Sequence, residues 1–258
     1  MNPANLAGAR VLVTGAAGGA GAQIARAFHA AGSVVHVCDI DAQAVARWRQ
    51  DQPDIAASVA DVADRLAVDR LFDGLEAAGG LDVLVNNVGI AGPTAAAEHV
   101  ALEDWDRTMA VNLGAHFLCC RRAIPTMKAR GGGAIVNISS TSARTGLPLR
   151  LPYVVSKAAV LSLTTNLARE LGPAGIRVNA ILPGGIRGPR LEKVIANKAE
   201  ALGVTPAAYE RDLVGFISMR TLVEPADIAA MAVFLASPAA RFVSGQLIGV
   251  CGNVEYEA

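Results

Sequence analysis

Short apolar runs alternate with longer amphipathic stretches along the chain. Runs such as VLV at 11–13 and VVHV at 34–37 are continuous and lack the strict alternation of half-buried strands. Continuous runs of this length are typical of strands that are covered on both faces. The pattern predicts strands over Arg10–Thr14, Val34–Cys38, Ile55–Ala60, Val83–Asn86, Ala134–Ser139, Arg177–Leu182 and Leu247–Val250.

The stretches between these runs have the length and periodicity of helices. Several carry end signals, since Gly32 follows the first, Gly172 follows the fifth and Pro225 opens the last. Regular alternation of strand and helix predicts an α/β fold: one doubly wound, Rossmann-type domain over residues 1–258, with a seven-stranded parallel sheet and helices on both faces. The predicted helices are Gly19–Ala31, Ala42–Gln50, Ala63–Ala78, Leu102–Arg130, Pro152–Leu171 and Pro225–Ala236.

The segment at about 184–223 breaks this alternation. It contains helical stretches around Leu191–Leu202 and Pro206–Ile217, with no strand between them. Long insertions without a strand are often binding segments or mobile lids. We predict a lid-like substrate segment here; the alternative, that its helices pack at a subunit contact, stays open.

The charge balance limits the classes of partner. The chain has 23 Lys and Arg residues against 23 Asp and Glu residues, so no global field would draw it to nucleic acid. We therefore expect a small-molecule partner and no nucleic acid. The four histidines are scattered without metal-ligand spacing, so no metal site is predicted.

The cysteines and the N-terminal residues bear on the compartment. Cys38, Cys119, Cys120 and Cys251 form no CxxC pair, which favours reduced thiols over a disulfide framework. The N-terminal residues show no signal-peptide pattern, and no apolar run reaches the roughly 18 residues of a membrane span. We expect a cytoplasmic protein with no membrane partner.

A glycine cluster follows the first predicted strand and opens the first predicted helix, reading TGAAGGAG over residues 14–21. Glycines allow a sharp turn and a close approach of the backbone to a pyrophosphate, whose charge the helix N-terminus stabilises. Glycine clusters alone are weak evidence, but this strand–helix context predicts a dinucleotide site. The expected contacts are Gly15, Ala17, Gly18, Gly19, Ala20 and Gly21.

The second predicted strand leads into Asp39, about twenty residues beyond this loop. A carboxylate at this place accepts hydrogen bonds from the adenosine ribose and repels the 2′-phosphate of NADP. Neither Gly18 nor Ile40 supplies the positive charge that NADP would favour. We therefore predict NAD as the cofactor, contacted by Asp39 and Ile40. The alternative that Asp39 only opens a turn with Asp41 stays open.

Tyr153 and Lys157 lie one helical turn apart, on the same face of a predicted helix. A phenol is a poor base at neutral pH because it ionises at about pH 10. An ammonium one turn away stabilises the phenolate and so favours acid–base chemistry. A YxxxK pair occurs in many helices by chance, so it is weak evidence alone.

With these motifs in place, the chain resembles the short-chain dehydrogenase/reductase family from Arg10 to Gly252. Further motifs follow in the family's order and on the expected elements, which makes the resemblance specific. They are Asp61-Val62 after the third strand, NNVG at 86–89 for the family's NNAG turn, Asn112 in VNL, Ser140 in NISS, YVVSK at 153–157 and the Pro183-Gly184 turn.

The resemblance implies a role for each of four residues. Tyr153 would exchange a proton with the substrate hydroxyl, and Ser140 would hydrogen-bond the same oxygen. Lys157 would bind the nicotinamide ribose, and the Asn112 carbonyl would hold a water that relays the proton. It also implies cofactor contacts from Asp61, Val62, Asn87, Gly89, Tyr153, Lys157, Pro183, Gly184 and Ile186.

Alternatives stay open for three of these residues. Ser140 stands among other hydroxyl residues (Ser139, Thr141 and Ser142), so its register could differ by one. Asn112 could be a packing amide, and Lys157 a solvated helix residue.

The function predicted on these grounds is hydride transfer between NAD(H) and a secondary alcohol or ketone. One alternative is an NADPH-dependent carbonyl reductase, and another is a cofactor-binding sensor or scaffold that has lost catalysis. The resemblance also implies a homo-oligomer, commonly a tetramer, built on the predicted helices Leu102–Arg130 and Pro152–Leu171.

Two features leave the substrate and cofactor contacts open. Gly188 stands where the family's PGxIxT would place threonine, and we expect Ser or Thr there to tighten cofactor binding. Arginines in the loops are compatible with an anionic substrate, although solvated arginines on flexible loops are the better explanation of the sequence. These arginines are Arg144, Arg150, Arg187 and Arg190.

Overall fold

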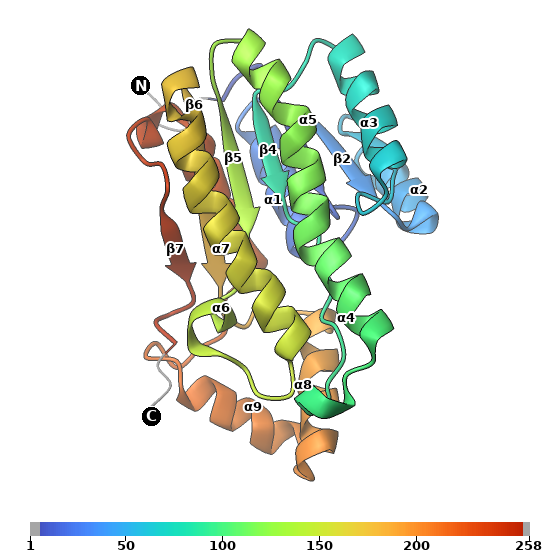
Figure 1. Ribbon diagram of the computed structural model, residues 1–258, viewed down its shortest axis with the longest axis vertical. Coiled ribbons are helices and arrows are strands. Elements are labelled where there is room, and N and C mark those ends of the chain that lie inside the picture. Colours follow the sequence, from blue (N-terminus) through green and yellow to red (C-terminus); the bar gives the residue numbers. More distant parts are fainter. Residues whose placement is uncertain (1–5, 255–258) are drawn as a thin grey trace.

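Seven parallel strands form one sheet, in the order β3-β2-β1-β4-β5-β6-β7, in the computed structural model of residues 6–254 (Figure 1). The predicted fold class is confirmed, and the predicted strands agree with it to within a few residues. The first and last residues of the predicted domain lie outside the described range. The strands are β1 (Arg10–Thr14), β2 (Val34–Asp39), β3 (Ala56–Val59), β4 (Val83–Asn86), β5 (Gly133–Ile138), β6 (Ile176–Pro183) and β7 (Leu247–Val250).

Helices cover both faces of this sheet, as the continuous apolar strands predict. Val11 and Val13 of β1 pack toward one face, while Leu12 between them packs toward the other. Successive residues such as Val11, Leu12 and Val13 are therefore all buried, which explains the missing alternation. The first face carries α1 (Gly19–Ala30), α2 (Ala42–Asp51) and α10 (Pro225–Ala236); the second carries α3 (Arg65–Ala77), α5 (Ala115–Ala129) and α7 (Leu151–Leu171).

The predicted helix Leu102–Arg130 is not continuous. It consists of α4 (Leu102–Met109), a π turn at Ala110–Gly114, and α5. A π turn takes one residue more than an α turn and often marks a functional position. Here it contains Asn112, whose side chain bonds other parts of the chain, so the helical period gave no sign of it.

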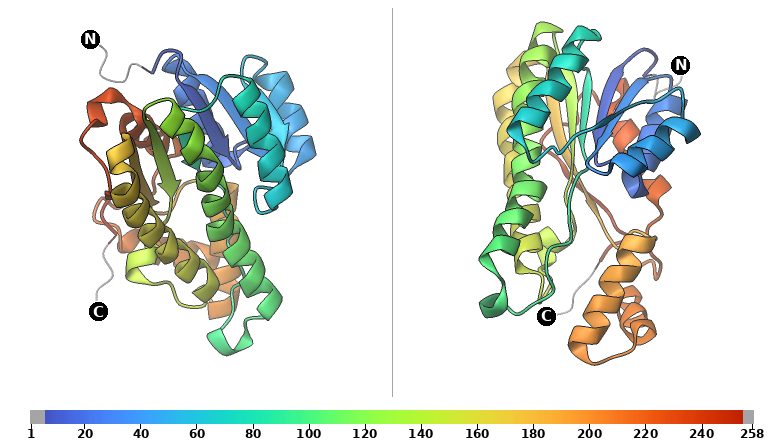
Figure 2. Two further views of the ribbon diagram at one scale, coloured as in Figure 1. Left: turned by 45° about the horizontal axis from the view of Figure 1, so that its top comes forward. Right: turned by 90° about the vertical axis from the view of Figure 1, so that its right-hand side faces the viewer.

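Two helices of the predicted lid segment lie beyond the carboxyl ends of the strands (Figures 1 and 2). They are α8 (Pro189–Leu202) and α9 (Pro206–Gly215), and the segment contains no strand, as expected. A single parallel bridge between Ile186 and Val223 closes its base. The remaining short helices are α6 (Ser142–Thr145) and three 3-10 turns at Ala97–His99, Gly172–Ala174 and Pro238–Ala240.

Two further features concern the state of the cysteines and the length of apolar helices. All four cysteines are free, and three of them are buried. No helix within residues 6–254 is long and apolar enough to span a bilayer.

Candidate active site

One cavity of about 860 Å³ opens at the carboxyl ends of the strands. β1 lies between β2 and β4, so the order of strands reverses here, and ligands bind at such points in doubly wound sheets. The volume is in the range of small-molecule sites. Ala17 and Asn112 do not line this cavity, whereas the other predicted site residues do: Gly15, Gly18, Gly19, Ala20, Gly21, Asp39, Ile40, Asp61, Val62, Asn87, Gly89, Ser140, Tyr153, Lys157, Pro183, Gly184 and Ile186.

The glycine loop has the shape that a dinucleotide requires. A Cβ atom on Gly21 would lie 2.5 Å from the Asn87 amide nitrogen, so only glycine allows this packing. Beside it, Gly18 and Gly19 line the cavity, and no protein atom occupies the space where their side chains would project. Gly18 also caps α1 without a side-chain hydrogen bond, which leaves the helix N-terminus available to phosphate.

Asp39 both faces the cavity and braces the glycine loop. Its Oδ2 atom accepts a hydrogen bond from the Ala17 amide at 3.2 Å, and its Oδ1 atom accepts one from the Asp41 amide at 3.2 Å. The predicted turn at Asp39–Asp41 therefore exists alongside the carboxylate's position in the cavity. The hydrogen bond from the Ala17 amide to Asp39 also fixes Ala17 beside the cavity, although Ala17 does not line it.

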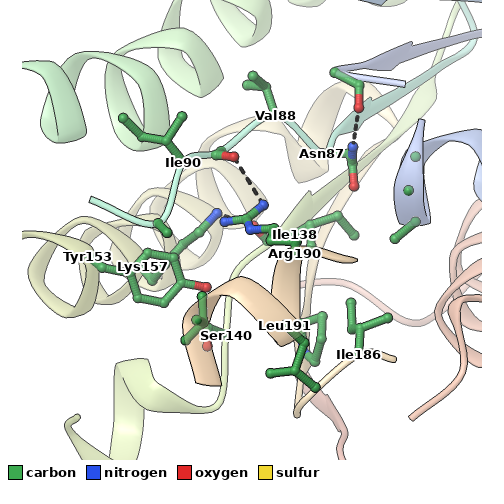
Figure 3. A pocket seen from close by; sticks show the side chains of 18 of the residues that line it. Asn87, Val88, Ile90, Ile138, Ser140, Tyr153, Lys157, Ile186, Arg190 and Leu191 are labelled. Carbon is green, nitrogen blue, oxygen red and sulfur yellow. Dashed lines mark hydrogen bonds between the residues drawn. The ribbon is translucent and has the colours of Figure 1, made fainter. Parts of the chain in front are cut away.

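Asn87 ties the glycine loop to the end of β4. Its side-chain amide donates to the carbonyl oxygens of Thr14 and Gly15, at 3.0 and 2.9 Å (Figure 3). In return, the Thr14 hydroxyl accepts from the backbone amides of Asn87 and Val88. Two turns that are distant in the sequence thus form one rigid edge of the cavity.

Tyr153 and Ser140 meet at the opposite end of the cavity. Figure 3 shows the Tyr153 hydroxyl directed toward the Ser140 side chain; Tyr153 lies in the first turn of α7 and Ser140 in the loop after β5. Ser139 is different: its hydroxyl donates to the Lys157 carbonyl oxygen at 2.8 Å and is buried against α7. Among the described residues, the Ser140 hydroxyl bonds only Ser142. It forms one hydrogen bond with the Ser142 hydroxyl and accepts another from the Ser142 backbone amide.

Lys157 is a buried residue, not a solvated one. Its Nζ atom donates to the Ile138 carbonyl oxygen at 2.8 Å, and the residue is only 3% exposed. Burial and the nearby Arg190 guanidinium lower the pKa of the Lys157 ammonium to about 7. A Cβ atom on Gly89 would lie 3.1 Å from this nitrogen, so a larger residue there would crowd it.

Asn112 stands behind the cavity wall and joins three segments. Its Oδ1 atom accepts from the Ile90 amide at 2.7 Å, and its Nδ2 atom donates to the Ile90 carbonyl at 3.1 Å. Nδ2 also donates to the Ser156 hydroxyl at 3.0 Å. The packing role left open by the sequence is therefore real, and the π turn is what presents this side chain to both neighbours.

The four loop arginines do not form one set. Arg144 bonds the Leu247 carbonyl away from the cavity, and Arg187 pairs with Glu224 at 2.8 Å. Of these four, Arg150 and Arg190 line the cavity and have no carboxylate partner among residues 6–254; Arg107 of α4 shares both features.

The backbone explains the glycine at position 188. Gly188 has φ +140°, a value that residues with a side chain rarely adopt, and it caps the N-terminus of α8. Space is open around it, so the obstacle to threonine is conformational strain, not crowding. The sequence predicts that Thr at position 188 would tighten cofactor binding, but the backbone strain it would introduce opposes that gain, and no sequence pattern indicates this strain.

Some cavity residues had no signal in the sequence. Tyr209 and Leu213 come from α9, and Arg107, Ala110 and Val111 come from α4 and the π turn. Val111 neighbours the Asn112 motif, but no local pattern marks the others, because the path of the chain brings them to the site. Within residues 6–254, no group of three or more His, Cys, Asp or Glu side chains could hold a metal ion.

The chain is similar to known proteins over most of its length. A sequence model of the family described as enoyl-(acyl carrier protein) reductase matches residues 15–253. A probable short-chain type dehydrogenase/reductase of Bradyrhizobium diazoefficiens is 38% identical over 251 residues, covering 94% of this chain and 86% of the relative. Galactitol 2-dehydrogenase (L-tagatose-forming) of Cereibacter sphaeroides is 38% identical over 259 residues, covering 96% and 95%. The solved structure of 7α-hydroxysteroid dehydrogenase, complexed with NADH and 7-oxo glycochenodeoxycholic acid, matches with a TM-score of 0.89 at 34% identity, covering 99% of this chain and 97% of that one.

Proposed function

Because the chain belongs to the short-chain dehydrogenase/reductase family, we propose that it is an NAD-dependent oxidoreductase acting on a small secondary alcohol or ketone. One observation carries the proposal. The Tyr153 hydroxyl is directed toward the Ser140 side chain, and both residues line a cavity that continues to the glycine loop and Asp39. A carbinol carbon held at one end would lie beside a nicotinamide whose adenosine occupies the other.

The proton chemistry belongs to Tyr153. In the oxidative direction it takes the proton of the substrate hydroxyl as the carbinol C–H bond breaks. Bound NAD⁺ would supply the acceptor for the hydride. The alcohol thus loses one hydride and one proton and becomes a ketone; in reduction the two return to it.

Two neighbours prepare this step. Ser140 donates a hydrogen bond to the substrate oxygen and so holds it against the tyrosine. Lys157, one helical turn away, places positive charge beside the developing phenolate and is positioned to bind the nicotinamide ribose hydroxyls. Asn112 fixes the loop and helix that carry these groups, and its place in the π turn suits a water held on its carbonyl.

The choice of NAD rests on Asp39. Its carboxylate lines the adenosine end of the cavity, where it would accept from ribose hydroxyls and repel a 2′-phosphate. The described dehydrogenase structure with bound NADH supports this choice, and a polyol dehydrogenase among the relatives supports a secondary alcohol as substrate.

Cofactor binding is the first test. NAD, NADH, NADP and NADPH are titrated separately, with the fluorescence of Trp48 and Trp105 and the thermal midpoint as readouts. A ligand at one hundred times its dissociation constant adds about 2.7 kcal/mol of stability. Preferential binding of NAD and NADH supports the proposal; preference for NADPH would instead favour a carbonyl reductase.

Turnover is the second test, in an NAD-coupled screen of secondary alcohols and polyols. Tyr153→Phe should lower kcat by about 10²- to 10⁴-fold while NADH still binds. Tyr209→Phe makes the same chemical change at another tyrosine of the cavity and is the matched control. Equal losses in both variants would contradict the role of Tyr153, and a protein that binds no cofactor would not fit the proposal at all.

We also infer a cytoplasmic homo-oligomer, with a tetramer as the expected form. Helices α5 and α7 cover one face of the sheet, and small residues of α7 such as Ala158 and Ser162 are partly or fully exposed there (Figure 1). Phe117 of α5 is 52% exposed on the same layer. Light scattering after size-exclusion chromatography tests the assembly.

A further inference from the structure

We propose that the substrate carries a small oxyanion, a carboxylate or a sulfonate, and that Arg150 and Arg190 bind it beside Tyr153. The inference rests on the proposed function, because it assigns the substrate class of that same site. It begins from the cations around the catalytic end of the cavity, which the hydride-transfer chemistry does not use.

Arg150 is the central observation. It immediately precedes α7 and lines the cavity, yet it is only 3% exposed. Its Nη2 atom donates to the Ala91 carbonyl oxygen at 2.5 Å, and its buried Nε atom has no hydrogen-bond partner. A buried charge without a partner is costly, and a guanidinium has more donors than this one bond uses. The unused donors fit an anionic ligand.

Its position relates Arg150 directly to the reaction. The guanidinium carbon lies 5.3 Å from the centroid of the Tyr153 ring. An anionic group held by Arg150 would therefore stand only a few bonds from a carbinol carbon at the Tyr153 hydroxyl. Planar, bidentate donors match carboxylate and sulfonate oxygens better than they match a neutral hydroxyl.

Arg190 of α8 brings a second guanidinium to the cavity. It extends from the first turn of α8, and its Nη1 atom donates to the Gly89 carbonyl oxygen at 3.0 Å (Figure 3). Its charge lies close enough to lower the pKa of both Arg150 and Lys157. Two arginines that repel one another across a cavity are stabilised by an anion placed between them.

The surroundings reinforce this positive end. Lys198 of α8 is also buried, donates to the Pro148 carbonyl oxygen, and has its pKa lowered by burial and by Arg150. Within residues 6–254, none of these three cations forms an ion pair with a carboxylate. The nearby walls are apolar, with Leu147, Val194 and Leu213, so they suit the carbon chain of a small hydroxy acid.

A second source of anion is the cofactor itself. The pyrophosphate would lie at the glycine loop, and Arg190, which donates to the Gly89 carbonyl oxygen, lines the same cavity as that loop and Arg150. The experiment must therefore separate substrate binding from cofactor binding.

The experiment compares matched probes that differ only in charge. 3-Hydroxybutanoate and 3-hydroxybutanamide form one pair; 2-hydroxypropane-1-sulfonate and its sulfonamide form the other. Each is titrated calorimetrically into the NADH complex, where an alcohol cannot react, and into the cofactor-free protein. We expect an anion preference of about tenfold or more, as for a charge-assisted hydrogen bond. The better of the two pairs distinguishes carboxylate from sulfonate.

Three variants assign the preference to residues. Arg150→Gln keeps a donor for Ala91 but removes the charge, and Arg190→Gln removes the second charge; each should reduce the preference to about twofold or less. Arg187→Gln is the matched control, because Arg187 lines the same cavity but is already paired with Glu224. The NADH dissociation constant and the thermal midpoint of each variant verify the fold. If Arg150→Gln does not fold, Arg190→Gln and Arg150→Lys carry the comparison.

Each outcome decides something definite. Equal binding of charged and neutral probes, or a preference that survives both substitutions, overturns the proposal. If Arg190→Gln weakens NADH binding but leaves the anion preference unchanged, Arg190 contacts the pyrophosphate, and its proposed role in binding the substrate is overturned. If the unmodified protein does not bind NADH, the proposed function is wrong. The anion preference is still measured in that case, because the probes are also titrated into the cofactor-free protein.

Discussion

Lys157 and Arg190 direct two cations at the same part of the cavity, from helices on opposite sides of it (Figure 3). The guanidinium, together with burial, lowers the pKa of the Lys157 ammonium to about 7 from its ordinary 10.5. This relationship makes the stability of the protein depend on pH in a definite direction.

Lys157→Met should remove that dependence. Below pH 7 the folded protein holds a buried cation and bears its full cost. Between pH 7 and 10.5 the folded state loses this proton while the unfolded state keeps it, so the stability of the natural protein rises with pH. Its thermal midpoint relative to Lys157→Met should therefore increase from pH 7 to pH 10. Lys128→Met, at an exposed position, is the control, and a constant difference would contradict the prediction. In Arg190→Gln the rise should begin at higher pH, because the repelling charge is gone.

Asn112→Ala should destabilise the protein by about 2–4 kcal/mol. The change removes hydrogen bonds to both backbone groups of Ile90 and to the Ser156 hydroxyl, and leaves them without that partner near the catalytic residues. Urea denaturation measures the loss, and kcat should fall with it. Asn112→Asp keeps the acceptor for the Ile90 amide, so an intermediate loss is expected; identical losses would argue against this hydrogen-bond account.

Asp39→Ala should reverse the preference between cofactors. The variant loses acceptors for the ribose hydroxyls, which weakens NADH by about tenfold, and it no longer repels a 2′-phosphate, so NADPH should bind more tightly. Fluorescence titration of both cofactors measures the change. Asp41→Asn, at the neighbouring cap of α2, is the control and should leave the preference intact. The Ala17 amide also loses its acceptor, so some loss of stability accompanies the effect.

Gly188→Thr should cost about 1–3 kcal/mol of stability, because φ +140° is strained for any residue with a Cβ atom. Gly188→Ala has the same strain without a hydroxyl and is the matched variant. Thermal midpoints give the shared cost, and the difference between the two NADH dissociation constants isolates the hydroxyl. Unchanged stability in both variants would contradict the conformational explanation of this glycine.

The sequence alone determined the architecture and the chemical core of the candidate site. Continuous apolar strands predict burial on both faces, because local periodicity reports which sides of an element are covered. The Gly15–Gly21 loop and the Tyr153–Lys157 pair were found because their spacings are short, and Asp39 was found because it ends the second strand of the unit that the loop opens. Their joining in one cavity follows from parallel strands ending at one edge.

Only the tertiary structure decided the contacts between distant segments. The π turn at Asn112 depends on partners at Ile90 and Ser156, and the strain at Gly188 depends on how the chain enters α8. Of the four loop arginines, Arg150 and Arg190 line the cavity without a carboxylate partner among the described residues, whereas Arg187 is paired with Glu224. Such differences depend on the path of whole loops, which the pattern of neighbouring residues does not encode.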